Sequence, residues 1–332
     1  MPTRRTFIGQ TAALIAGAAA TACDPREYAR AHGATLRLSV AAGNIGGVFY
    51  PYGGAIASVI SKHVTGVAAT AEVTGGTIDN LQFIRQGTAD LAFATADMLD
   101  EAYRGVGEFS KVGRVPARAL AMLYYSYLHT ATLDSTGITS LADLRGKVVN
   151  TGSPGSSTEV IAMRVLRAAG VDPDRDVRRQ GLGLAAAVDA VRDGKIDALM
   201  FIGGVPMGAL IDLAATPRRR LVLMQSATTL PTLRAAFGDA IYVERTIPRG
   251  TYTGINEDIG VVGSANVLVA DARMHDDLAH EIARTLFEHQ NELAAVHPEA
   301  RNLTIESAVQ GSPIAYHDGA IEYYRERNAW PS

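Results

Sequence analysis

Short apolar runs alternate with amphipathic stretches along the chain from residue 36 onward. Runs rich in β-branched residues predict strands, and apolar residues that recur at helical spacing predict helices. The predicted strands are 36–41, 68–73, 91–95, 147–150, 198–202 and 259–269, and the predicted helices are 51–63, 77–86, 158–169, 185–192 and 277–296. This alternation is typical of α/β domains with largely parallel sheets.

The length of the chain and one apolar stretch suggest how the domains are divided. At about 150 residues per domain, a chain of this length predicts two domains. The β-rich stretch 120–133 leads into a polar segment, so we expect the chain to enter a middle domain there and to return later. One lobe would then comprise 36–135 and 246–332 and the other 136–245, after a linker at 23–35.

The first 22 residues have the pattern of a secretory signal. Arg4 and Arg5 stand near the start, and an apolar stretch of small residues follows and ends at Ala22. Phe7 and Ile8 follow the arginines at the offset that specifies the twin-arginine route. A transmembrane anchor is the weaker interpretation, because a span needs about 20 strongly apolar residues. The sequence therefore predicts export to the periplasm.

Cys23 is the single cysteine of the chain, and it follows the small residues Ala20-Thr21-Ala22. A cysteine at the end of a signal resembles a lipoprotein box, whose cysteine takes a lipid and tethers the mature protein to the inner membrane. The lipoprotein motif normally has Leu where this chain has Ala20. Ordinary cleavage after Ala22 fits the same small residues. Both alternatives stay open, and we favour lipidation.

The charge of the chain argues against a nucleic-acid partner. The formal net charge is −3, and removal of residues 1–22 takes away Arg4 and Arg5 but no acidic residue. Proteins that bind nucleic acid need clustered Lys and Arg, which an acidic mature chain does not offer. After the signal, no apolar run is long enough to span a bilayer.

Four loops rich in Gly, Ser and Thr follow predicted strands and precede helices, at 43–50, 75–80, 152–159 and 203–206. The first amides of a helix lack intrahelical partners, and the helix dipole favours negative charge there. Such loops bind carboxylate or phosphate without a basic side chain, and in open α/β sheets they gather where the strands end. Two of the loops fall in each predicted lobe, as a ligand held between the lobes requires.

Simpler structural roles explain parts of these loops equally well. Ser156 and Glu159 form the pattern of a capping box, and Thr77 has the position of a helix N-cap. No loop is a phosphate-binding P-loop, because 155–158 lacks the lysine, and 43–50 does not have the spacing of a dinucleotide fingerprint.

Segments spread in order over nearly the whole mature chain share the pattern of one known family. They are Val48-Phe49-Tyr50, 75–81, 87–93, Leu123-Tyr124, Leu128-His129, 152–159, 193–198 and 247–252. Together they resemble the TAXI-type solute receptors of TRAP transporters. The resemblance implies a two-lobed, type II periplasmic-binding-protein fold and a membrane permease partner driven by an ion gradient. It also implies a small organic acid, such as glutamate or 2-oxoglutarate, as the ligand.

The resemblance further implies ligand-binding residues on both sides of a cleft. On the first lobe they are Asn44, Gly46, Tyr50, Thr77, Asn80, Thr95 and Asp97, and on the middle lobe Ser156, Ser157, Thr158, Gly203 and Gly204. Members of the family often have Gln where this chain has Thr95. The shorter side chain enlarges the cleft or admits water, which leaves the identity of the ligand open.

The sequence has no pattern that indicates catalysis. It has no His-Glu-x-x-His motif, no cysteine cluster and no Gly-x-Ser-x-Gly elbow. His275, His280 and His289 are predicted to be solvated, because their spacing does not suit one metal site. Tyr124, Tyr125 and Tyr127 have the pattern of a ligand-binding group, but tyrosines in a β-rich run more often pack, and packing is the favoured interpretation. We therefore expect no metal and no cofactor, and we favour a receptor over an exported enzyme or a ligand sensor on the same scaffold.

Overall fold

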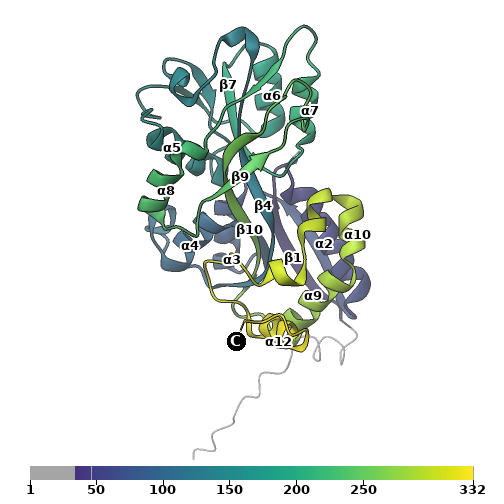
Figure 1. Ribbon diagram of the computed structural model, residues 1–332. Coiled ribbons are helices and arrows are strands. Elements are labelled where there is room, and N and C mark those ends of the chain that lie inside the picture. The colour runs from purple at the N-terminus through teal and green to yellow at the C-terminus, as the bar shows by residue number, and fades with distance from the viewer. Residues whose placement is uncertain (1–33, 46, 332) are drawn as a thin grey trace, which may run out of the picture.

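One mixed sheet extends through both lobes of the molecule (Figure 1). Its strand order is β2-β1-β3-β10-β4-β7-β5-β6, with β8 beside β4 and β9 beside β10. The long strands β4 (Ala117–Leu133) and β10 (Ile259–Asp271) lie antiparallel at the centre of the sheet and run through both lobes. They therefore connect the two lobes.

The structure is a computed structural model that describes residues 34–45 and 47–331. The predicted signal, Cys23 and Gly46 lie outside the described residues. Among the described helices, none combines the length and the hydropathy that crossing a bilayer requires.

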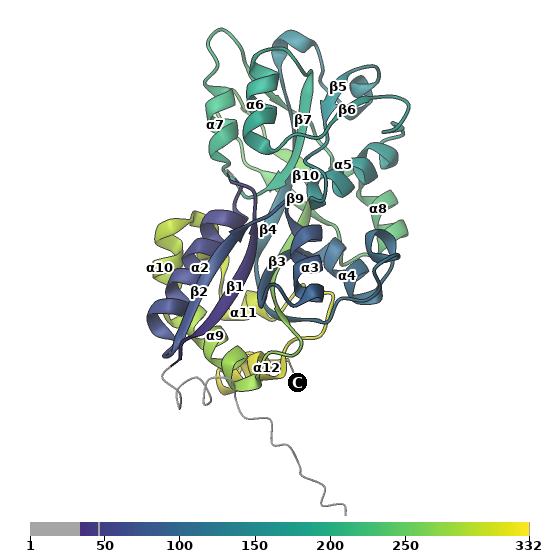
Figure 2. The same cartoon turned by 180° about the vertical axis from the view of Figure 1, so that it is seen from behind.

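Lobe 1 contains both ends of the described chain. Its other strands are β1 (Leu36–Gly43), β2 (Val67–Val73) and β3 (Leu91–Thr95), which lie side by side in Figure 2. Its helices are α2 (Phe49–His63), α3 (Thr77–Gln86), α4 (Ala96–Arg104), α9 (Asp276–Glu288), α10 (Gln290–Val296), α11 (Ile305–Ala308) and α12 (Asp318–Glu326). Short 3-10 helices occur at Gly107–Phe109 and Pro298–Asn302.

Lobe 2 is built from the middle of the chain. Its strands are β5 (Val148–Asn150), β6 (Arg178–Gln180), β7 (Ala198–Gly203), β8 (Leu221–Leu223) and β9 (Val243–Ile247). Its helices are α5 (Ser157–Ala168), α6 (Leu184–Arg192), α7 (Gly208–Ala214) and α8 (Leu230–Phe237), with 3-10 turns at Asp134–Thr136, Leu141–Leu144 and Ala227–Thr229. In Figure 1, α5 and α8 lie on one side of this lobe and α6 and α7 on the other.

Each lobe packs around its own apolar core. The core of lobe 1 includes Tyr124 of β4 and Val267 of β10. Further along the same strands, Leu128 of β4 and Val262 of β10 belong to a core of lobe 2. The change from one core to the other therefore takes place within the two long strands. The predicted lobe boundaries, at 135 and 246, stay a prediction.

The sequence pattern predicted the type of most elements, and two predictions were wrong. The predicted helix 77–86 coincides with α3, and the strand 91–95 coincides with β3. The sheet, however, is mixed rather than largely parallel, because β10 and β4 are antiparallel to their neighbours. The helix predicted at 277–296 is interrupted at His289, whose φ and ψ of −116° and 23° separate α9 from α10.

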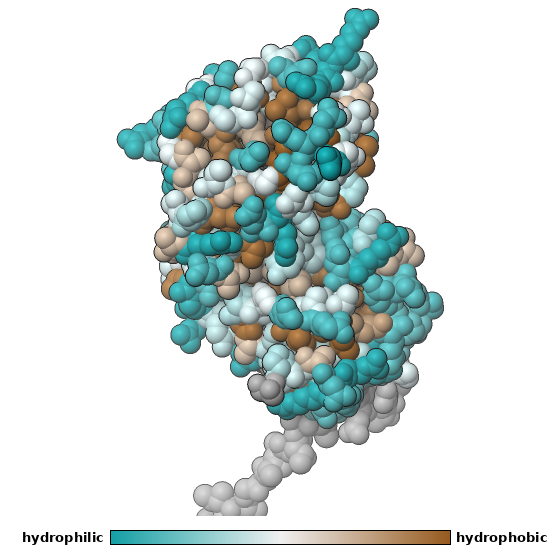
Figure 3. All heavy atoms as spheres, viewed as in Figure 1, coloured by the Kyte–Doolittle hydropathy of each residue, from teal (hydrophilic) through white to brown (hydrophobic). Residues whose placement is uncertain are grey.

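The surface seen in Figure 3 narrows between the lobes, and its hydrophobic residues form small groups among hydrophilic ones. Large apolar side chains that are exposed include Ile45, at 70% exposure, beside the first glycine loop. Scattered single residues of this kind are normal on a folded protein. The distribution of apolar residues on the surface therefore does not indicate a binding site. The loops between the lobes do indicate one.

Candidate functional site

The strand ends and helix starts of the two lobes enclose a small cavity. Its volume is about 50 Å³, enough for about four water molecules at roughly 10–15 Å³ each. It is lined from lobe 1 by Gly43, Asn44, Gly47, Val48, Phe49, Gly75, Gly76, Thr77 and Thr95, from lobe 2 by Ser156, Ser157, Thr158, Phe201, Ile202 and Gly203, and from the central strands by Tyr124, Ser126 and Asn266. None of these described lining residues has a charged side chain.

Within the described residues, four helices begin at this cavity. The N-termini of α2, α3 and α4 have no side-chain hydrogen bond to cap them. At α5, Ser156 Oγ accepts a hydrogen bond from the Glu159 amide at 3.3 Å. Gly76, which precedes α3, has a φ of 127° that favours glycine. Because the positive ends of the helix dipoles converge here, the cavity suits an anion.

The floor of the cavity is a row of polar side chains across three strands. Thr95 of β3 and Tyr124 of β4 lie directly opposite Asn266 of β10, so all three face the same side of the sheet. Asn266 Nδ2 donates to the backbone oxygen of Tyr124 at 3.3 Å and to Ser126 Oγ at 2.8 Å. The Oδ1 of Asn266 and the Tyr124 hydroxyl are buried without a hydrogen-bond partner among the described residues. Two polar groups at the cavity floor therefore remain to be satisfied.

Direct hydrogen bonds join the two lobes at the edge of the cavity. Asn44 Nδ2 donates to Ser153 Oγ across the cleft at 3.3 Å and to the oxygen of Gly75 at 3.1 Å. The Thr77 hydroxyl lies 3.5 Å from Ser157 Oγ, at the limit of a hydrogen bond. These contacts show the lobes closed against each other.

Asp97 lies directly behind the cavity in a buried network that also joins the lobes. Its Oδ1 accepts a hydrogen bond from the Thr95 hydroxyl at 2.6 Å. Its Oδ2 accepts from the Tyr242 hydroxyl at 2.8 Å and from Arg164 at 3.3 Å, and Arg164 also pairs with Glu101. Burial opposes the charge of Arg164, but the nearby Tyr242 and Asp97 raise its pKa above the ordinary value. Asp97 therefore holds Thr95 in place and links α4 to lobe 2.

Glu299 forms a second link between the lobes on another side of the cavity. Its Oε1 accepts a hydrogen bond from the amide of Val205 at 2.8 Å, and Asn302 donates to its Oε2 at 2.5 Å. Burial raises the pKa of Glu299 above its ordinary value. The hydrogen bonds from Val205 and Asn302 act in the opposite direction and lower the pKa. Gly204 packs so closely on this carboxylate that a Cβ there would lie 2.7 Å from Glu299 Cγ.

The cavity brings together most of the residues that the resemblance implied. The predicted residues that line it are Asn44, Thr77, Thr95, Ser156, Ser157, Thr158 and Gly203. Four others lie outside the lining: Tyr50, Asn80, Asp97 and Gly204. Asn80 is fully engaged, since its Nδ2 donates to the oxygens of Ala42 and Phe93 and its Oδ1 accepts from Thr74. Ligand contact by any of these residues stays a prediction.

The three polar lining residues on the central strands were not among the predicted ligand-binding residues. Tyr124 was expected to pack in its strand, and neither Ser126 nor Asn266 was singled out. A polar residue inside an apolar strand such as β10 is the one local signal that points to Asn266. Its place beside Tyr124 depends on strand register, which the sequence pattern does not give.

A larger hollow lies beside α5 and α8 but is a weaker candidate. Its volume is about 680 Å³, and the residues around it include Glu159, Arg167 and Arg179. These charges are already paired, since Arg167 and Arg179 both contact Asp174 and Arg179 lies 3.6 Å from Glu159. Because these charged side chains pair with one another, they are not free to bind a ligand. The smaller cavity, in contrast, has polar groups without a partner among the described residues.

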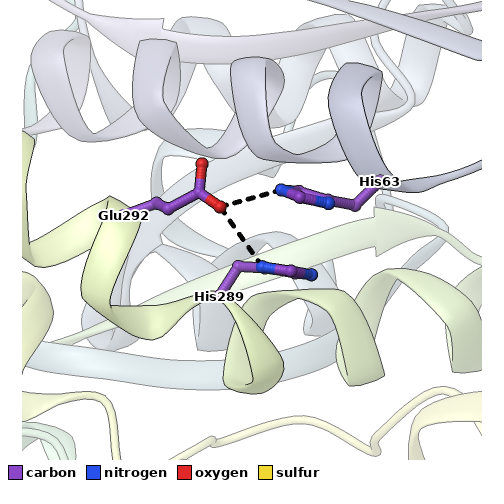
Figure 4. Close-up of side chains that lie close together, drawn as sticks. All are labelled: His63, His289 and Glu292. Carbon is purple, nitrogen blue, oxygen red and sulfur yellow. Dashed lines mark hydrogen bonds and ion pairs between the residues drawn. The ribbon is translucent and has the colours of Figure 1, made fainter.

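Away from the cavity, His63, His289 and Glu292 join α2 to α10 (Figure 4). His63 Nε2 and His289 Nδ1 lie 2.9 Å and 3.3 Å from the same Glu292 oxygen. The two rings are stacked, with centroids 3.4 Å and planes 9° apart. Nitrogens of parallel rings do not point at one centre, so the arrangement fits a shared carboxylate better than a tetrahedral metal site. His289 was predicted to be solvated; its side chain is 28% exposed and also contacts His63 and Glu292.

Residues 40–327 match the family described as NMT1-like. The chain belongs to the NMT1-like family. This match does not distinguish the TAXI type, which stays a prediction.

Solved structures resemble this NMT1-like chain over most of its length. MatC from Rhodopseudomonas palustris with bound malate is 13% identical, with 80% of this chain and 89% of that chain covered and a TM-score of 0.54. A protein from Bordetella bronchiseptica RB50 is 18% identical, with 90% of each chain covered and a TM-score of 0.52. The periplasmic aliphatic sulphonate binding protein SsuA from Escherichia coli is 15% identical, with 90% and 84% covered and a TM-score of 0.45. At these identities the likeness concerns the fold alone. The two structures with TM-scores above 0.5 confirm the predicted α/β, two-lobed fold.

Proposed function

We propose that the protein is an extracytoplasmic solute receptor that closes its lobes over a small organic acid. One observation carries this proposal: both lobes line a single cavity, where hydroxyl groups and helix N-termini converge without any charged side chain among the described lining residues. Hydroxyl and amide donors of this kind bind a carboxylate.

The environment of the cavity supports binding rather than catalysis. The described lining residues include no His, Lys, Asp or Glu that would act as a general base. Asp97 lies nearby, but both of its oxygens already accept hydrogen bonds. A ligand that contacts both lobes binds the closed state better than the open one and therefore drives closure.

The family resemblance supports a TRAP-type permease as the partner that receives the ligand. It also supports glutamate or 2-oxoglutarate as representatives of the ligand class. The predicted twin-arginine signal supports a periplasmic location, and lipidation of Cys23 would keep the receptor next to a permease in the inner membrane. The mass of the mature N-terminus would distinguish a lipidated Cys23 from ordinary cleavage.

Calorimetry on the mature protein, stripped of bound ligand by unfolding and refolding, tests the proposal. Organic and amino acids would be compared with a neutral sugar and an amine. We expect at least one carboxylate to bind, and Ser157→Ala to weaken it by about tenfold or more because a donor to a charged group is lost. Ser61→Ala is the control, since Ser61 bonds to the backbone of α2 away from the cavity. Binding of the sugar or the amine, with no carboxylate bound, would reject the proposal.

A further inference from the structure

The side-chain oxygen of Asn266 is a buried acceptor at the cavity that has no donor. The backbone oxygen of Tyr124 can only accept, so the hydrogen bond between them fixes the Asn266 amide group with its Nδ2 toward β4. Asn266 Oδ1 then faces away from that bond, and no described residue donates to it. A buried acceptor is costly when it is left unpaired, so the ligand itself is the expected donor.

Other groups around the cavity are donors and suit a carboxylate. Tyr124 is 1% exposed, and its hydroxyl has the Ser126 side chain as a polar neighbour but no hydrogen-bond partner among the described residues. Thr158 Oγ1 accepts from the amide of Ile202 at 3.4 Å, which leaves its hydroxyl proton to be donated. The uncapped N-terminus of α3 adds backbone amides. A ligand therefore needs an anionic group and, beside it, a donor for Asn266.

The surroundings of the cavity disfavour an ammonium group as that donor. The positive ends of the helix dipoles point at the cavity, and no described lining residue is acidic. Of the carboxylates beside the cavity, Asp97 is occupied by Thr95, Tyr242 and Arg164, and Asp79 accepts a hydrogen bond from the Gly75 amide. A keto group is also disfavoured, because its oxygen would face the Asn266 oxygen and both are acceptors.

We propose that, within the class of small organic acids, the cavity selects a 2-hydroxycarboxylate over the 2-oxo and 2-amino acids of the same carbon skeleton. The carboxylate would accept from Tyr124, Thr158 and the helix N-termini, and the neighbouring hydroxyl would donate to Asn266 Oδ1. This inference rests on the proposed function, since it assumes that the cavity binds an organic acid.

Calorimetry on the wild-type protein with matched sets of acids tests the inference. One set is 2-hydroxyglutarate, 2-oxoglutarate and glutamate, and the shorter set is lactate, pyruvate and alanine, with both enantiomers of each hydroxy acid. In the set that fits the cavity, we expect the hydroxy acid to bind about tenfold tighter or more. The oxo acid leaves Asn266 Oδ1 unpaired, and the amino acid buries an ammonium charge that no acidic residue of the described lining offsets. Tighter binding of the oxo or amino acid would overturn the inference and leave the proposed function standing. Binding of no acid would overturn both.

Substitution of Asn266 tests the same contact from the side of the protein. Asn266→Asp replaces the amide by a carboxylate, which repels the anionic ligand but pairs with an ammonium. We expect the affinity for the hydroxy acid to fall by about tenfold or more, with the preference shifting toward the amino acid. Asn150→Asp is the control, because Asn150 is also buried but does not line the cavity. An unchanged preference in Asn266→Asp would overturn the inference.

A pair of tyrosines provides a second test that adds no buried charge. Tyr124 and Tyr52 are both buried with unpartnered hydroxyls, but Tyr52 does not line the cavity. We expect Tyr124→Phe to weaken hydroxy-acid binding by about tenfold and Tyr52→Phe to change it by less than about twofold. Equal effects of the two substitutions would overturn the placement of the ligand against Tyr124.

Discussion

His129 of β4 is a titratable side chain that is completely buried. Its Nδ1 lies 2.9 Å from the oxygen of Tyr127, and its Nε2 lies 3.0 Å from the Tyr252 hydroxyl, which accepts from the Met207 amide. A carbonyl can only accept, so Nδ1 carries the proton and Nε2 accepts from Tyr252. Burial lowers the pKa of His129 to about 4, although the hydrogen bond to Tyr127 opposes the shift. The neutral form is therefore part of the folded state.

Acidification is expected to destabilise the protein through His129. The unfolded chain takes up a proton near pH 6.5 and the folded chain only near pH 4, so stability is complete above pH 6.5 and falls as the pH drops toward 4. The loss would be roughly 3 kcal/mol at 1.36 kcal/mol per pKa unit. His129→Gln should flatten this part of the pH profile in urea unfolding, whereas His280→Gln, on the surface of α9, should not. A profile that His129→Gln leaves unchanged would contradict the assignment.

At the scale of residues, the sequence located the loop side of the cavity better than its floor. Thr77 and Ser157 stand in glycine-rich loops, where the residue type and the helix start together indicate a binding role. Asn266 and Tyr124 stand inside long strands, where no turn or cap marks them. Their meeting depends on the register of β10 against β4, which includes two irregularities that a sequence pattern does not reveal.

At the scale of elements, residues that mark helix ends made the bounds of α3 predictable. No such residue marks the end of α9, and its end was therefore predicted wrongly. Gly76 and Gly87, both at positive φ, bound α3 on either side. No glycine or proline marks the break at His289, so apolar periodicity alone favoured one continuous helix. Tertiary contacts made by His289 and Glu292 with α2 accompany the break. The break thus belongs to packing between helices rather than to local sequence.

Glu292 is expected to stabilise the contact between α2 and α10 in a pH-dependent way. Hydrogen bonds from Lys62 and His63 lower its pKa from 4.5 to about 2. Its charge therefore stabilises the fold above pH 4.5, and this contribution is lost as the pH falls toward 2. Glu292→Gln should lower the melting temperature at pH 6, and the difference from the wild type should shrink at pH 3.

The matched control for this prediction is Glu288→Gln on the neighbouring helix. Glu288 pairs with Arg284 one turn away, and its side chain is 44% exposed. A pair of this kind within one helix contributes little, about 0.3–0.5 kcal/mol. If Glu292→Gln shifted the melting temperature no more than Glu288→Gln at pH 6, the contacts of Glu292 would not contribute to joining α2 and α10.

At the scale of the whole molecule, the lobes are held together by contacts on more than one side of the cavity. Arg164 of α5 pairs with Asp97 and Glu101 of α4. Glu299 of lobe 1 accepts from Val205 of lobe 2. Both contacts lie outside the cavity lining or at its back, so they stabilise closure without taking up ligand donors. Removal of either should therefore reduce the population of the closed state before it affects the fold of each lobe.

Gly204→Ala is expected to impair closure because of the space that Glu299 occupies. A Cβ at Gly204 would lie 2.7 Å from Glu299 Cγ, and Glu299 is 4% exposed, with its carboxylate held by Asn302. The substitution should weaken ligand binding by about tenfold, since the binding-competent fraction falls, and small-angle scattering with ligand should show a larger radius of gyration. Gly208→Ala is the control, because nothing lies near a Cβ there. Wild-type affinity and scattering in Gly204→Ala would exclude the Glu299 contact from closure.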